Sequence, residues 1–330
     1  MPISESKDAA PLSNLEVRVH HESIETRAVV DSEPVRVPRF LIEGEAGGPT
    51  LTITAAQHGR ELNGIEAARR VIEQLPGEPL RGTVQVFPVV SPPSVHAVSQ
   101  VVPGDTQNIN RIWPGHADGT NTERIAAALA PLIVQADALV DLHGWTDWTV
   151  CATLCGSCEH ELTHRMARAF GLPCTYCTTN GFQPGNLKTY AQQQGLLAIG
   201  AELTPQWRLS EPSVQGGVRG LMNVMRHLGM LPGEPALPET QWHYRADTPR
   251  ETVNAAQAGL FTRSGEIGTW VEESALLGRL YDYQTLRCVQ EVRAPIEGLL
   301  VNLGPCHNGV ESNTVPEDAM LAEVWRAERW

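Results

Sequence analysis

A histidine and a glutamate three residues apart mark the first stretch of this sequence that could do chemistry. His58 and Glu61 lie in the segment QHGREL, between an apolar, β-branched run and an amphipathic one. A tight turn from a strand into a helix brings residues i and i+3 together, and open α/β sheets place their sites at such turns. Imidazole and carboxylate are common zinc ligands, and a catalytic zinc keeps three protein ligands beside a water. The spacing predicts two zinc ligands and requires a third from elsewhere.

His143 is the expected third ligand. It lies at the carboxyl end of the apolar run DALVDLHG, residues 137–144. If this run is a strand parallel to the one before His58, the two histidines meet at the same edge of the sheet. Asp141 precedes His143 by two residues, faces the same side of a strand and would orient the imidazole. Either histidine alone could simply end a strand, but the combination predicts a metal centre.

A second histidine pair, His160 and His164, has the HExxH spacing of helical zinc proteases. Leu162, Met166 and Ala169 form the apolar stripe that we predict for this helix, roughly opposite to both histidines. The helix is also too short to be the long internal helix of such a protease. We therefore expect a solvated helix face here, with a protease centre as the less favoured alternative.

Four cysteines have a spacing that occurs in zinc ribbons: Cys155, Cys158, Cys174 and Cys177. The second pair, however, reads as part of a strand, and a predicted helix fills most of the spacer. Buried free cysteines acting as small apolar residues are common. A second zinc held by these four thiolates remains an open alternative.

Strand-like and helix-like runs alternate over the first two thirds of the chain. Apolar and β-branched runs predict strands, whereas apolar residues at helical spacing predict helices. The expected strands are 35–43, 50–56, 83–90, 138–142 and 196–203, and the expected helices are 62–75, 122–135 and 159–170. This alternation predicts an α/β fold with a mixed, mostly parallel sheet covered by helices on both faces.

The remaining third of the chain reads as a small all-β domain with Gly and Pro between short strands and no convincing helix. Residues 256–261 resemble residues 295–300, and each copy is followed by a run rich in Val or Leu. Unless the likeness is chance, it indicates a barrel or sandwich of pseudo-symmetric halves. We expect an N-terminal extension (1–34), a zinc-dependent catalytic domain (35–235) and a β-rich C-terminal domain (236–330).

Composition excludes several classes of protein. Hydrophobic residues make up 42% and charged residues 19%, which is unlike a disordered chain or a coiled coil. The net charge of −13 disfavours nucleic acid and anionic membranes as partners. No run is long enough to span a membrane, and no secretory leader pattern is present. We expect a cytoplasmic protein with a small-molecule substrate, and homo-oligomerisation stays open.

Four short motifs, in this order, resemble those of the succinylglutamate desuccinylase/aspartoacylase family, which are zinc-dependent amidohydrolases related to metallocarboxypeptidases. They are His58-x-x-Glu61, Asn110-Arg111 in NINRIWPG, His143 in DLHG and Glu202 in GAELTP. The likeness spans residues 35–230, and the β-rich tail resembles the C-terminal domain of many members. It implies a zinc carboxypeptidase-like fold.

The resemblance also implies roles for these residues. His58, Glu61 and His143 would hold zinc, which acidifies a bound water and polarises the acyl carbonyl. Glu202 would be the general base that later protonates the leaving amine, and burial at the end of an apolar strand would suit that task. The implied reaction is hydrolysis of the amide bond of a small N-acylated amino acid.

Asn110 and Arg111 would bind the α-carboxylate of the substrate. Family members commonly carry an arginine upstream of this pair that stabilises the oxyanion. No arginine occurs in residues 91–109 of this chain, where only Gln100 or His96 could stand in. This departure keeps a catalytically impaired binding protein open as an alternative, beside a metallocarboxypeptidase-like peptidase.

A second departure concerns specificity. Aspartoacylases place an arginine about ten residues before the catalytic glutamate to grip an acidic side chain. Gln192 stands near that position here, with Lys188 further upstream. We therefore expect N-acyl derivatives of neutral or basic amino acids to be better substrates than N-acetylaspartate.

Overall fold

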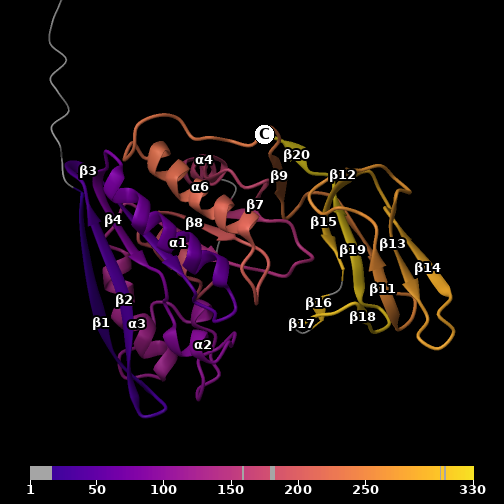
Figure 1. Cartoon of the computed structure of the whole chain (residues 1–330), viewed down its shortest axis with the longest axis horizontal. Helices are drawn as coiled ribbons and strands as arrows, with labels where there is room; N and C mark the ends of the chain where they lie inside the picture. Colours follow the sequence, from indigo (N-terminus) through magenta and orange to yellow (C-terminus); the bar gives the residue numbers. More distant parts are fainter. Residues whose placement is uncertain (1–16, 158–159, 179–182, 305, 308–309) are drawn as a thin grey trace, which may run out of the picture.

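A computed structural model describes residues 17–157, 160–178, 183–304, 306–307 and 310–330. The larger part of the molecule is built on a ten-stranded mixed sheet with the order β1-β2-β4-β3-β5-β8-β6-β7-β9-β20 (Figure 1). Its strands are β1 (Arg18–Val30), β2 (Glu33–Glu43), β3 (Glu45–Ala55), β4 (Arg81–Phe87), β5 (Ala138–His143), β6 (Ala152–Ser157), β7 (Cys174–Thr178), β8 (Leu197–Glu202), β9 (Trp242–Arg245) and β20 (Glu328–Arg329). The four central strands β4, β3, β5 and β8 run parallel, so their carboxyl ends share one edge.

Helices cover both faces of this sheet. They are α1 (Leu62–Gln74), α2 (Pro92–His96), α3 (Asn121–Ile133), α4 (Glu161–Phe170), α5 (Leu187–Gln193) and α6 (Glu211–His227), with short 3₁₀ turns at Leu75–Gly77 and Ile109–Arg111. Alternate residues of β5 point to opposite faces. Val140 packs into the core beneath α1, α4 and α6, and Leu139 into the core beneath α3 and α5. The predicted α/β class is thus confirmed.

Helix α6 is the long element that the sequence pattern did not reveal, because its glycines interrupt the apolar spacing. Those glycines allow close packing. A Cβ added at Gly220 would lie 2.3 Å from the ring of Phe170 in α4, and one at Gly217 would lie 2.9 Å from the Cβ of Ala67 in α1. The residues that lower helix propensity are therefore the ones that let three helices share one face of the sheet.

The smaller part is all-β, as expected, and no described residue beyond 236 is helical. One sheet has the order β10-β19-β15-β12 and the other β14-β13-β11-β18, with a separate pair β16-β17. The strands are β10 (Arg250–Asn254), β11 (Gly259–Arg263), β12 (Trp270–Val271), β13 (Leu276–Tyr281), β14 (Cys288–Arg293), β15 (Gly298–Leu303), β16 (Cys306–His307), β17 (Val310–Glu311), β18 (Thr314–Val315) and β19 (Met320–Trp325).

The internal repeat in the sequence corresponds to equivalent strand pairs in the two sheets. Gly259 and Gly298 begin β11 and β15, and these strands pair antiparallel with β13 and β19 respectively. A common buried cluster that includes Phe261 and Leu300 joins the two sheets. The repeat is therefore structural, with one copy in each half of the small β-rich part.

The two parts of the chain are joined through strands as well as through packing. β9 and β20 form an antiparallel pair at one edge of the large sheet, and β1 and β2 lie at its opposite edge. The division into 1–34, 35–235 and 236–330 stays a prediction. Strands from all three of these segments belong to the large sheet, since β1 lies in the first segment and β9 and β20 lie in the last. None of the helices in the described residues has the length and apolarity needed to cross a membrane.

Candidate active site

The turn between β3 and α1 positions the first two predicted ligands. β3 ends at Ala55, and Glu61 is the N-cap residue of α1. A Cβ at Gly59 would lie 1.8 Å from the carbonyl oxygen of Ser94, so only glycine fits where these two backbone segments meet. This close approach holds the turn that carries both side chains against α2.

His58, Glu61 and His143 converge on one point at the carboxyl edge of the sheet. Glu61 Oε1 lies 2.7 Å from His58 Nδ1, and Glu61 Oε2 lies 3.0 Å from His143 Nδ1. The three residues are only 5%, 3% and 7% exposed, and their ligand atoms all lie within 4.8 Å of one another. A compact, buried set of two imidazoles and a carboxylate matches a divalent transition metal such as zinc.

The outer nitrogen of each imidazole is already engaged. His143 Nε2 lies 2.8 Å from Asp141 Oδ2, and His58 Nε2 lies 3.0 Å from Asn108 Oδ1. Asp141 itself accepts hydrogen bonds from Thr54 and Gln57. The predicted Asp141–His143 contact is therefore present, and both Nδ1 atoms are left facing Glu61. This is how metal-binding histidines are commonly held.

The charges of this cluster depend strongly on one another. Burial alone would raise the pKa of Glu61, but His58 and His143 lower it to about 2. Burial alone would lower the pKa of His143, but Asp141 and Glu61 raise it well above its usual range. Without a metal, a proton on the His143 imidazole compensates part of the buried negative charge; a bound cation could take over that task.

Glu202 lies beside these residues at the end of β8, where it is the pairing partner of His143 on β5. Its Oε2 atom is buried and has no hydrogen-bond partner among the described residues. Burial raises the pKa of Glu202 to about 7. A carboxylate with a free oxygen and a near-neutral pKa is suited to exchanging protons.

Asn110 and Arg111 reach the same place from the 3₁₀ turn before α3. Asn110 is buried, with Nδ2 3.3 Å from His143 Nε2 and Oδ1 accepting a hydrogen bond from the backbone N–H of Leu187. Arg111 donates a hydrogen bond to the carbonyl oxygen of Asn110 and keeps an exposed side chain. Asn110 is thus largely engaged in holding its neighbours, and Arg111 is the more available of the two.

One cavity of about 170 Å³ unites all six predicted site residues: it is lined by His58, Glu61, Asn110, Arg111, His143 and Glu202. Gln100 also lines it, whereas His96 lines a separate cavity. Of the two candidates for the missing arginine, only Gln100 is therefore near the site.

Lys188 is a cavity residue to which the sequence analysis gave no role. It projects from α5, and burial lowers the pKa of its ammonium group. The side-chain amide of Gln192 is instead bonded to the carbonyl oxygens of Cys155 and Ala198. One helical turn separates the two residues, and no sequence pattern says which of them faces the cavity.

The HExxH segment is oriented partly as we predicted. Met166 and Ala169 of the predicted apolar stripe are buried, whereas Leu162 is 56% exposed and Thr163 and Ala167 are buried instead. His160 caps the helix through Thr163. His164 is on the packed side instead of the solvated face that we expected.

The alternative of a zinc ion held by Cys155, Cys158, Cys174 and Cys177 does not fit the arrangement of the described cysteines. Cys174 and Cys177 lie three residues apart on β7 and face different buried clusters. Cys158 lies outside the described residues. Cys155 and Cys177 do lie close together, but with His164 in place of Cys174.

Comparison with known proteins now identifies the family. The model of the succinylglutamate desuccinylase/aspartoacylase catalytic domain matches residues 47–228. The chain is 28% identical over 277 residues to N-alpha-acetyl-L-2,4-diaminobutyric acid deacetylase of Halomonas elongata, covering 81% of this chain and 80% of that protein.

Solved structures agree. The product-bound ectoine utilization protein EutE from Ruegeria pomeroyi is 27% identical with a TM-score of 0.77, over 96% of this chain and 97% of that one. A succinylglutamate desuccinylase from Silicibacter sp. TM1040 shares the fold at 24% identity and a TM-score of 0.77, over 98% and 100% of the two chains. On the family match over more than half of its length, the chain belongs to the succinylglutamate desuccinylase/aspartoacylase family.

Proposed function

We propose that this protein is a zinc-dependent deacylase that hydrolyses the amide bond of a small N-acylated amino acid. The observation that carries the proposal is the unpartnered Glu202 oxygen, which shares a cavity with the converging His58, Glu61 and His143. A proton acceptor beside a metal-binding triad is the arrangement that amide hydrolysis needs. The family match and the deacetylase relative support the same reaction class.

His58, Glu61 and His143 would hold the zinc, which when bound supplies a Lewis acid for the acyl carbonyl and lowers the pKa of water. Glu202 takes a proton from the attacking water and delivers it to the leaving amine. Its pKa near 7 allows both steps at neutral pH. Asp141 holds the His143 ring by its Nε2 atom throughout.

Arg111 is the proposed anchor for the α-carboxylate. Its guanidinium lines the cavity and remains exposed, so it can form two hydrogen bonds with a carboxylate. Asn110, by contrast, would act mainly by positioning His143 and the start of α5. Arg111 would therefore bind the substrate, and Asn110 would position its neighbours.

Lys188 is the proposed source of the positive charge that the family's upstream arginine would otherwise supply. It lines the cavity, and both Asp141 and Glu202 act electrostatically on its ammonium group. An ammonium group in a buried cavity stabilises a developing oxyanion strongly, because little water screens it. In this role it would serve every substrate and would not select for an acidic side chain.

The substrate class follows from these assignments. Arg111 and Lys188 are the arginine and lysine among the described residues that line the cavity, and Gln192 is bonded to backbone. With Arg111 on the α-carboxylate and Lys188 on the acyl oxygen, neither cation is available to bind a second carboxylate on the amino acid. N-acyl derivatives of neutral or basic amino acids are the proposed substrates. The Halomonas relative, named for a diaminobutyric acid derivative, supports a basic one.

A substrate panel tests this proposal. N-acetyl, N-formyl and N-succinyl derivatives of diaminobutyrate, ornithine, leucine, aspartate and glutamate are incubated with zinc-loaded protein, and the released amine is measured. Turnover of the basic or neutral derivatives is expected. Cleavage of peptides alone would favour the peptidase alternative, and binding without any turnover would favour the impaired binding protein.

Lys188→Met, compared with Lys188→Arg, separates the two possible roles of this lysine. A loss of kcat on all substrates, partly restored by arginine, is expected for an oxyanion role. A loss confined to N-acetylaspartate would mean that Lys188 grips an acidic side chain instead. Zinc content, measured in parallel, should stay at wild-type level in both variants.

A further inference from the structure

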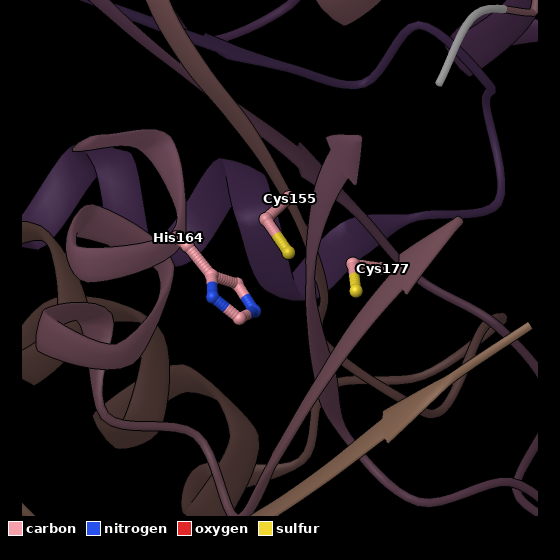
Figure 2. Close-up of side chains that lie close together, drawn as sticks. All are labelled: Cys155, His164 and Cys177. Carbon is pink, nitrogen blue, oxygen red and sulfur yellow. The ribbon is translucent and has the colours of Figure 1, made fainter. Parts of the chain in front are cut away.

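Two cysteines and a histidine from three different elements come together on the α4 side of the large sheet, and none of the three lines the cavity of the proposed active site. Cys155 comes from β6, Cys177 from β7 and His164 from α4 (Figure 2). Their sulfur and nitrogen atoms all lie within 4.8 Å of one another. We propose that the reduced protein binds a second metal ion here, with zinc as the ion tested, in a structural role.

The donor set suits this ion. Thiolate and imidazole are the ligands of structural zinc sites, with Zn–S about 2.3 Å and Zn–N about 2.0 Å. Neighbouring ligand atoms around such an ion lie roughly 3.3–3.8 Å apart, so the cluster needs only a small contraction. The sequence spacing that suggested a four-cysteine site thus pointed at two of the right residues and missed the histidine.

An independent observation comes from His164. Its Nε2 atom is buried and has no hydrogen-bond partner among the described residues. An unsatisfied buried nitrogen costs free energy unless something binds it. A metal ion between His164 and the two sulfur atoms would satisfy it.

His243 on β9 offers a fourth ligand. Its Nε2 atom lies 3.9 Å from Cys177 Sγ, and its ring centroid lies 4.6 Å from that of His164. The other nitrogen, Nδ1, lies 3.0 Å from the hydroxyl of Thr175, which fixes the ring. Burial, helped by His164 and Arg245, lowers the pKa of His243 to about 4, so the imidazole is neutral as a metal ligand must be.

The site is covered by the end of the chain. The ring centroid of Trp330 lies 4.7 Å from that of His164 and 4.9 Å from that of His243, and its Nε1 donates a hydrogen bond to Thr175. A metal ion here would connect α4, β6, β7 and β9 beneath the tryptophan. Its role is therefore to fasten the outer strands of the large sheet.

Metal binding is coupled to the redox state of Cys177, which is disulfide-bonded in this structure. A phosphine reductant takes an oxygen atom from water and leaves two thiols in place of the disulfide, with the phosphine oxidised to its oxide. Zinc then displaces the protons of Cys155 and Cys177 into solvent. Since burial raises the pKa of Cys155 to about 12, the thiol stays protonated until metal displaces its proton.

Metal analysis of the full-length protein tests the proposal. After phosphine reduction, zinc loading and dialysis, two equivalents of zinc per chain are expected, and one equivalent after oxidation to the disulfide form. Cys155→Ser and His164→Ala should each remove one equivalent. Cys174→Ser, on the same strand as Cys177, and His160→Ala, one turn from His164, are matched controls that should keep two.

His58→Ala separates this proposal from the active-site zinc, because it should lose the other equivalent and leave the cysteine site filled. Cobalt(II) loading of the His58→Ala protein gives a second readout, since thiolate ligation produces an intense sulfur-to-cobalt absorption band. The band should vanish when Cys155→Ser is added. Reduced His58→Ala protein that retains no zinc, or that shows no such band with cobalt(II), would overturn the proposal whatever the outcome of the activity tests.

Discussion

His143 and Glu202 are pairing partners at the carboxyl ends of the adjacent parallel strands β5 and β8. The proposed metal ligand and the proposed base are therefore spaced by the ladder of the sheet and not by a loop. Backbone hydrogen bonds on the buried strands hold that spacing, so it does not depend on substrate binding. A base fixed in this way is ready for proton transfer before substrate arrives.

The first prediction concerns that base. Glu202→Gln keeps the side-chain volume and removes the proton acceptor, so zinc content should stay constant while kcat falls by roughly two to four orders of magnitude. Steady-state kinetics and elemental analysis of the same preparation check this. Unchanged turnover would show that another group takes the proton.

The second prediction concerns pH and stability in the metal-free protein. The pKa of Glu202 is about 7 in the folded state, against an ordinary value of 4.5. The folded state therefore binds the proton more tightly, and the stability of the wild type falls as pH rises from about 4.5 to 7. Glu202→Gln lacks this loss, so above pH 7 it should be more stable by on the order of 3 kcal/mol.

Denaturant unfolding of chelator-treated wild type and Glu202→Gln at several pH values measures this difference. The advantage of the variant should shrink towards zero below pH 4.5, where the glutamate is protonated in both states. An advantage that does not change with pH would contradict the burial argument.

The third prediction concerns Asp141. Its contact with His143 Nε2 orients the ring, so Asp141→Asn should weaken zinc binding at the active site about 10- to 100-fold. Competition with a fluorescent chelator gives the affinity. Asp137→Asn, at the other end of the same strand segment, is the matched control and should bind zinc as the wild type does.

The fourth prediction concerns Arg111. A bidentate bond between arginine and a carboxylate contributes on the order of 1.5–3 kcal/mol. Arg111→Ala should lower kcat/KM about 10- to 150-fold for acids and have little effect on the corresponding primary amides, with zinc content unchanged. Arg165→Ala, an exposed arginine of α4, serves as the control.

Local pattern was enough to predict much of this molecule. Strand ends and turns in the sequence indicated His58, Glu61 and His143, and the family resemblance indicated Asn110, Arg111 and Glu202; all six line one cavity. The buried face of α4 was predicted only in part. Met166 and Ala169 are buried, but Thr163 and Ala167, small and weakly apolar, also fill the core while Leu162 lies in solvent. Helix α6 was not predicted because its glycines interrupt the apolar pattern. Their role, to allow close packing against Phe170 and Ala67, is evident only from the folded structure. The sequence could not place Lys188 in the cavity, because the direction of its side chain depends on how α5 packs in the folded structure.

The pairing of β9 with β20 makes the β-rich part an insertion within an edge hairpin of the large sheet. A module joined by two adjacent strands cannot swing as one on a single linker would, which favours a fixed orientation over hinge motion. The order of folding is also constrained, because the hairpin closes only after the inserted strands have brought residue 328 back to residue 243. A break in the backbone within the insertion would leave β20 held at the sheet edge only by its pairing with β9 and by packing, so limited proteolysis of the native chain should loosen that edge even where the cut lies far from it.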